Sequence, residues 1–147
     1  MGRFILKGRL NTQEIEQALG YYIPKVNAEL GLIDKNAFTM EFLRKLLPAL
    51  KCYIGENGYI LYVIAPDYWG EKELAVVSFY VEPGARKSPK ALLELIRFVQ
   101  KEAQIQKCRK LVMGGHFNEA KMPRFFEKIG FKPMTFYQFV KGEKNGN

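Results

Sequence analysis

The spacing of apolar positions is helical in the first third of the chain. Between Thr12 and Pro24, apolar residues recur at intervals of three and four. This spacing predicts a helix with one buried face, which Thr12 caps and Pro24 interrupts or kinks. A second helical pattern covers Ala37–Leu47, and Pro48 closes it. A short strand over Phe4–Leu6 is expected before both helices.

The pattern then becomes that of strands. Cys52–Ile54 and Tyr59–Ala65 flank Asn57–Gly58, a pair that favours a hairpin because both residues tolerate positive φ. The segment Pro66–Gly70 reads as a loop. Leu74–Val81 is an unbroken β-branched and aromatic run, which predicts a central strand buried on both faces.

Helical spacing returns after Pro89, a residue that the first turn of a helix accepts. The apolar stripe of this helix comprises Ala91, Leu92, Leu95, Ile96, Val99 and Ala103. Leu111–Met113 is the next strand, Pro123–Ile129 a short helix that Gly130 ends, and Phe131–Val140 a last strand.

The predicted order of elements is β-α-α-β-β-β-α-β-α-β. An antiparallel hairpin followed by a βαβ crossover indicates an α/β (α+β) fold. We expect a mixed, mostly antiparallel sheet of six to seven strands with helices on both faces. The absence of repeats and linkers predicts a single domain over residues 1–141, followed by a flexible C-terminal tail, residues 142–147.

Composition places the chain among ordinary globular domains. Its 147 residues are 48% apolar and 26% charged, enough to build a core without metals or disulfides. Cys52 and Cys108 give no disulfide framework, and one histidine with two distant cysteines predicts no metal site. No apolar run approaches the ~20 residues that span a bilayer. We therefore expect a soluble, reduced, cytoplasmic protein without a membrane partner.

The net charge of +8 attracts anions of several kinds. Nucleic acid, acidic proteins and phosphorylated cofactors all fit such a field, and the charge alone selects none of them. A solvated lysine-rich surface explains it equally well.

One stretch of the sequence places several positive charges at a specific candidate site. In Val81–Leu93 a central strand leads through a basic loop into the N-terminus of an amphipathic helix. Backbone N–H groups and the positive end of the helix dipole together bind phosphate or pyrophosphate. Arg86, Lys87 and Lys90 add charge, and Ser88 adds a hydroxyl. The alternative is an ordinary strand–helix turn whose basic residues face water.

Here the sequence resembles the GNAT acetyltransferase superfamily. Its members carry an Arg/Gln-x-x-Gly-x-Gly/Ala loop between a central strand and a helix, and that loop holds the pyrophosphate of acetyl-coenzyme A. Arg86 and Ala91 match the first and last positions. Pro89 stands where glycine is usual, and it lacks the N–H of a donor.

A second stretch extends the resemblance. Arg124–Phe131 is similar to the late helix of the superfamily, usually written Tyr-Glu-Lys-Leu-Gly-Phe, and Asn118 lies upstream of it as a cofactor-contacting asparagine often does. Phe126 takes the place of the tyrosine that commonly protonates the departing thiolate, and phenylalanine has no proton to donate. The resemblance covers Tyr59–Val140.

The resemblance implies that acetyl-coenzyme A lies between the strand ending near Val81 and the strand Leu111–Met113. The pantetheine arm would pair with the backbone of the first of these strands, and the pyrophosphate would rest on the basic loop. The cofactor-binding residues so implied are Phe79, Tyr80, Val81, Arg86, Lys87, Ser88, Lys90, Ala91, Asn118 and Phe126.

Acetyl transfer also needs a base for the amine and an acid for the thiolate. His116, the only histidine, and Glu82, at the end of the central strand, are the candidate bases. Tyr137 is the candidate acid, with Tyr80 as a second. The alternatives are an exposed histidine, a surface glutamate and tyrosines that serve packing.

The expected function is an acetyl-coenzyme A-dependent N-acetyltransferase acting on a small-molecule or protein amine by direct transfer. The losses at Phe126 and Pro89 keep a second reading open, a catalytically degenerate binding or assembly module of the kind that small viral genomes carry. A third reading, a nucleic-acid-binding domain, rests on charge without a recognition motif. The sequence leaves monomer and dimer open.

Overall fold

The computed structural model describes residues 6–30, 40–114 and 121–134. The chain divides into two compact units, residues 1–114 and 115–147, and each is described by itself. The second unit contains α4, Lys121–Lys128. The first contains, in chain order, β1 Gly8–Arg9, α1 Thr12–Leu30, α2 Met40–Leu46, β2 Lys51–Gly55, β3 Gly58–Pro66, β4 Lys72–Val81, the 3₁₀ turn η1 Pro83–Ala85, α3 Lys90–Ile105 and β5 Lys110–Val112.

The sheet of the first unit is mixed. Its strands lie in the order β1-β2-β3-β4-β5; the first four are antiparallel, and β5 is parallel to β4. The described residues contain five strands where six to seven were predicted. Of the predicted last strand, Phe131–Met134 is not extended sheet, and residues 135–140 lie outside the described residues.

The predicted first strand is displaced along the chain. Leu6 lies outside the sheet, and β1 pairs Gly8 with Ile54 and Arg9 with Tyr53. Residues 4 and 5 of the predicted strand lie outside the described part. The predicted N-terminus of α1 also needs a correction, because Asn11 caps the helix in place of Thr12.

The cap of α1 is a reciprocal pair. The Asn11 side-chain oxygen accepts from the Glu14 N–H at 2.9 Å, and the Glu14 carboxylate accepts from the Asn11 N–H at 3.0 Å. The helix then continues through Pro24, so of the two predicted outcomes the interruption is wrong, while the kink stays a prediction. Both Pro24 and Gly20 are exposed, so water can bind the carbonyl that loses its partner. No described helix combines the length and apolarity needed to cross a bilayer.

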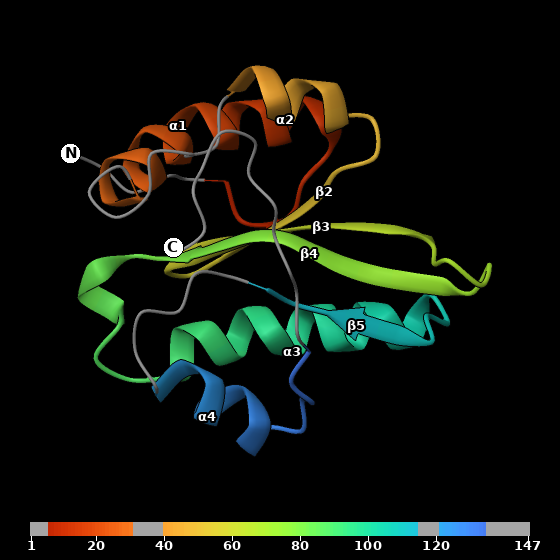
Figure 1. Ribbon diagram of the computed structural model, residues 1–147. Helices are drawn as coiled ribbons and strands as arrows, with labels where there is room; N and C mark the ends of the chain where they lie inside the picture. Colours follow the sequence, from red (N-terminus) through yellow and green to blue (C-terminus); the bar gives the residue numbers. More distant parts are fainter. Residues whose placement is uncertain (1–5, 31–39, 115–120, 135–147) are drawn as a thin grey trace, which may run out of the picture. The chain divides into compact units, whose positions relative to one another are not determined.

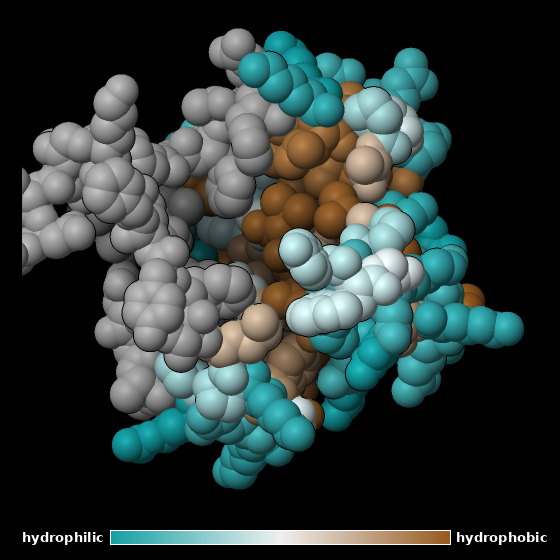
Figure 2. Space-filling view, turned by 45° about the vertical axis from the view of Figure 1, so that its right-hand side comes forward, coloured by the Kyte–Doolittle hydropathy of each residue, from teal (hydrophilic) through white to brown (hydrophobic). Residues whose placement is uncertain are grey.

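The sheet separates two apolar cores, with α1 and α2 on one face and α3 on the other (Figure 1). Period-two alternation sends Tyr59 and Leu61 toward α1, and Ile60 and Tyr62 toward α3. Some apolar side chains stay at the surface on the side shown in Figure 2. The partly buried members of the α1 core are Leu6, Tyr21, Leu46, Leu47, Val63 and Val77.

A β-bulge changes the side-chain alternation of β4. Leu61 pairs with Ser78 and Tyr62 with Val76, which leaves Val77 as an extra residue. Leu74 and Val76 face α3 before the bulge. After it, the residues that face α3 are Phe79 and Val81, while Tyr80 faces α1. Without the extra residue these three side chains would exchange faces.

β4 and β5 run together only briefly. Their parallel pairing comprises Glu73–Lys110, Leu74–Leu111 and Ala75–Val112. Beyond Ala75, no described strand pairs with this edge of β4. Most of β4 is consequently half-buried, with only Leu74 and Tyr80 fully buried, so the predicted burial on both faces is wrong over most of the strand.

The second unit shows the predicted end of α4 at Gly130. This glycine has φ +103°, a conformation that side chains disfavour. The Phe131 N–H reaches back to the Phe126 carbonyl at 2.9 Å and closes the last turn.

The β2–β3 hairpin was predicted correctly, but the predicted reason, positive φ at Asn57 and Gly58, is wrong. Its two turn residues are Glu56 and Asn57, and neither Asn57 nor Gly58 has positive φ. Gly58 is required by close approach instead, since a Cβ there would collide with the backbone carbonyl of Tyr80. The hairpin thereby fixes the end of β4.

We expect Gly58→Ala to lower the free energy of unfolding by about 1–3 kcal/mol, because backbone must shift to admit the methyl group. Gly20→Ala is the matched control. It lies in α1 with no atom near its Cβ position, and a helix interior gains about 0.5–1 kcal/mol from alanine. Urea unfolding measures both; an unchanged stability in Gly58→Ala would contradict the close approach.

Candidate functional site

The chain turns from β4 into α3 through η1, and this corner presents free backbone donors. α3 has sixteen residues, and Pro89 at its N-cap makes no side-chain cap. The Lys90 N–H donates to Ser88 Oγ at 3.3 Å. The helix supplies no carbonyl for the Ala91 and Leu92 N–H groups, because no earlier helical turn precedes them to provide an acceptor. The corner therefore offers two donors at the positive end of a helix dipole.

Exposed side chains add to this positive corner. Lys87, Ser88 and Lys90 are all exposed, and neither lysine forms an ion pair with another described residue. An anion at the first turn of α3 could thus reach two ammonium groups without displacing a carboxylate from either.

Arg86 differs from these lysines because it is already bound. Its guanidinium makes two bonds to the Glu29 carboxylate on α1, at 2.9 and 3.0 Å, and its Nε donates to the Val81 carbonyl at 2.8 Å. The guanidinium also lies 5.2 Å from the centre of the Tyr80 ring. A phosphate that recruits Arg86 must compete with Glu29.

Tyr80 joins the same cluster through its hydroxyl. Its side chain is buried, and the hydroxyl donates to Glu29 Oε1 at 2.9 Å. Burial raises the pKa of Tyr80, and the neighbouring Glu29 carboxylate raises it further. Tyr80 therefore holds its proton firmly and is a poor general acid.

Glu82, a candidate base, is paired with Lys25 of α1. The Lys25 ammonium lies 3.2 Å from the Glu82 carboxylate and 2.8 Å from the Tyr21 hydroxyl. The hydrogen bond with Tyr21 raises the pKa of Lys25, and Glu82 raises it further against the opposing effect of desolvation. Glu82 would therefore meet a substrate amine with one of its carboxylate oxygens already paired with Lys25.

The edge of β4 beyond Ala75 is where the pantetheine arm was predicted to pair. The backbone of Phe79, Tyr80 and Val81 lies in this stretch, next to the opening where β5 departs. The Val81 carbonyl is occupied by Arg86 Nε. The pairing of the arm with this edge stays a prediction.

Four predicted site residues come after Gly114 in the sequence. His116, Asn118 and Tyr137 lie outside the described residues. Phe126 is buried in the second unit, where its ring lies 5.7 Å from the Phe125 ring and 5.4 Å from the Phe131 ring. The predicted contact of Phe126 with the cofactor stays a prediction.

Sequence reasoning missed the contribution of α1. Lys25 and Glu29 are four residues apart on the helix, and they pair with Glu82 and Arg86, which are also four apart. Charges at this spacing share one helix face. The matched spacing of opposite charges was the available signal, but both pairs join residues 57 positions apart.

Comparison with known proteins adds evidence on the fold. No protein-family model and no curated protein sequence matches the chain. Among solved structures, a ribosomal-protein-alanine N-acetyltransferase from Brucella melitensis biovar Abortus 2308 is 16% identical over 93% of this chain and 99% of its own, with a TM-score of 0.63.

Two further structures resemble the chain to the same degree. An aminoglycoside N-acetyltransferase solved in complex with CoA is 16% identical over 92% of this chain and 98% of its own, with a TM-score of 0.62. An integron cassette protein from the mobile metagenome of V. cholerae is 17% identical over 99% and 96%, with a TM-score of 0.63. At such identities the likeness concerns the fold, and the chain has the fold of GNAT acetyltransferases, as the resemblance implied.

Proposed function

We propose that the chain is an acetyl-coenzyme A-dependent N-acetyltransferase that acts on an amine by direct transfer. The observation that carries this proposal is the β4–α3 corner, where two unpaired N–H donors and two free lysines lie at the end of a strand that parts from its neighbour. In a fold shared with acetyltransferases, this corner fits the diphosphate of coenzyme A.

Different residues would hold different parts of this cofactor. The Ala91 and Leu92 N–H groups, Ser88, Lys87 and Lys90 would bind the diphosphate. The backbone of β4 from Phe79 to Val81 would orient the pantetheine arm. When bound, acetyl-coenzyme A supplies an activated acyl thioester, and the protein contributes mainly by positioning an amine against it.

The proton transfers fall to fewer candidates. Glu82 is a candidate base that forms an ion pair with Lys25. His116 is the second candidate base, and Tyr137 remains the candidate acid, since the Tyr80 hydroxyl already donates to Glu29. The acceptor is a small-molecule or protein amine.

A second function is favoured by one observation. Phe126 stands where the resemblance places the usual proton donor, and phenylalanine has no proton to donate. A domain that binds coenzyme A without turning it over would serve as a binding or assembly module. The two functions share a ligand and differ in turnover.

Thiol release from acetyl-coenzyme A, measured with a thiol reagent over a panel of amines, separates the two. We expect amine-dependent release by the wild-type chain. Phe126→Tyr should accelerate it by about 100-fold or more, because a positioned general acid contributes roughly 100- to 10,000-fold. Phe126→Leu is the control without a proton and should not accelerate release. Tight coenzyme A binding with no release for any amine would instead indicate the binding module.

Glu29→Gln should tighten coenzyme A binding by roughly two- to fivefold. The variant frees Arg86 from an ion pair whose side chains are 44% and 39% exposed, and pairs this exposed contribute about 0.2–1 kcal/mol. Isothermal titration measures the change. Glu16→Gln is the matched control, because Glu16 lies on the same helix and pairs with Arg44. Equal or weaker binding in Glu29→Gln would show that Arg86 does not reach the cofactor.

A further inference from the structure

The turn between β3 and β4 presents two aromatic side chains to solvent. Tyr68 is 94% exposed and Trp69 77% exposed, and their ring centres lie 5.6 Å apart. Adjacent large aromatic residues with this much free surface are uncommon on a soluble protein unless they bind something. The turn lies at the end of the sheet away from Val81 and the first turn of α3 (Figure 1).

The turn is held in one conformation by Asp67. This carboxylate is 7% exposed, and one of its oxygens accepts from the Trp69 and Glu71 N–H groups, each at 2.9 Å. Its other oxygen lies 3.1 Å from the Lys110 ammonium. Gly70 completes the turn with φ +80°. The exposure of the two rings is thus built into the fold, and little conformational freedom remains to be lost on binding.

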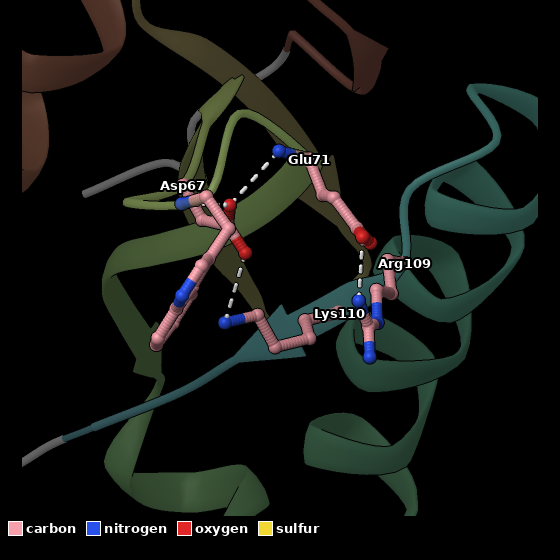
Figure 3. A pocket seen from close by; sticks show the side chains of 5 residues that line it. Asp67, Glu71, Arg109 and Lys110 are labelled. Carbon is pink, nitrogen blue, oxygen red and sulfur yellow. Dashed lines mark hydrogen bonds and ion pairs between the residues drawn. The ribbon is translucent and has the colours of Figure 1, made fainter.

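A shallow hollow of about 350 Å³ lies beside the rings, lined by Asp67, Trp69, Glu71, Arg109 and Lys110. Figure 3 shows that the acidic groups of this hollow turn toward basic ones, Asp67 to Lys110 and Glu71 to Arg109. Lys110 also lies 3.3 Å from Glu73 and 5.5 Å from the centre of the Trp69 ring. The carboxylates at this end are therefore neutralised locally.

Further cations at this end have no such partner. Lys72 and Lys107 are exposed, and neither forms an ion pair with the residues that the structure describes. The Arg109 N–H donates to the Lys72 carbonyl at 2.8 Å, so Lys72 adjoins Arg109, and Lys107 comes two residues before it. Arg109 remains 67% exposed beside Glu71. We call Tyr68, Trp69, Lys72, Lys107 and Arg109 the hairpin-tip surface.

We propose that the hairpin-tip surface binds single-stranded nucleic acid. Unpaired bases would stack on Tyr68 and Trp69, and phosphates would contact Lys72, Lys107 and Arg109. Flat aromatic faces bordered by cations are the combination that binds single strands without sequence preference. The net charge of +8, which the cofactor corner does not account for, favours the same kind of partner.

The composition of the surface separates this partner from two others. Protein interfaces have cores depleted of charged residues, whereas three of the five residues of the hairpin-tip surface are cations. A duplex keeps its bases stacked on one another, so it offers no base faces to the two rings. The site lies away from the cofactor corner, and the proposal does not depend on acetyl transfer.

Trp69 is the only tryptophan of the chain, so its fluorescence reports on this surface alone. We expect oligo(dT) and oligo(U) of about 12 nucleotides, within the span that one domain commonly covers, to quench it in a saturable way. The affinity should fall steeply with added salt. The same sequence as a duplex should bind several-fold more weakly.

Variants then locate the site, with binding followed by the anisotropy of a labelled oligonucleotide. Tyr68→Ala and Trp69→Ala should each weaken binding by roughly 5- to 150-fold without changing the melting temperature, since both side chains are exposed. Lys72→Gln with Lys107→Gln should reduce the slope of log affinity against log salt by about 1.4, or ~0.7 for each lost phosphate contact. Lys87→Gln, at the opposite end of the sheet, is the matched control.

Three results would overturn the proposal. The first is the absence of quenching and of anisotropy change at millimolar oligonucleotide and low salt. The second is binding that Lys87→Gln weakens and the aromatic variants do not, which places the anion elsewhere. The third is a Trp69-dependent increase in mass with protein concentration on sedimentation, which makes the rings a contact between copies.

Discussion

The register between β3 and β4 is the constraint on which the cofactor end of the molecule depends. A single extra residue, Val77, turns Phe79 and Val81 toward α3 and Tyr80 toward α1. β5 leaves β4 at nearly the same level, after Ala75. The bulge thus lies near the level beyond which the described residues show no pairing on this edge of β4, and β4 leads through η1 to the first turn of α3. Bulges often accompany such sites because they re-aim side chains.

Placing Tyr80 on the α1 face has an electrostatic consequence. Its hydroxyl meets Glu29, which also binds Arg86, while Lys25 one turn earlier binds Glu82. Two opposite-charge pairs therefore join α1 to the loop that follows β4. Each pair is partly exposed, so neither contributes much to stability. They affect ligand binding instead, because a ligand that uses Arg86 or Glu82 has to compete with the partner of that residue.

The sequence predicted those features that follow from local patterns. The apolar runs on either side of Asn57–Gly58 gave β2 and β3, the helical stripe gave α3, and Gly130 gave the end of α4. The bulge could not be predicted because every residue of Leu74–Val81 except Ser78 is apolar, so a shift in alternation leaves no clear pattern in the sequence. Pro24 misled because propensity is local, and an exposed proline next to a solvated carbonyl is tolerated within a long helix.

The candidate site likewise has a part that is contiguous in sequence and a part that joins distant residues. The strand, the basic loop and the helix N-terminus are contiguous in sequence, and the anion site could be predicted from them. The α1 contacts are not contiguous, and periodicity cannot reveal a pair 57 residues apart. Structural likeness over more than nine-tenths of the chain supports the fold, while the residues of the corner support the ligand.

The most direct test is a titration of the ¹⁵N-labelled chain with coenzyme A, followed through its backbone amide resonances. The account predicts that the largest shifts fall on the Ala91 and Leu92 N–H groups, the two donors that the first turn of α3 leaves free, with saturation at a common dissociation constant. Saturating coenzyme A that moves neither resonance would contradict the central claim, because the diphosphate would then not lie at the β4–α3 corner.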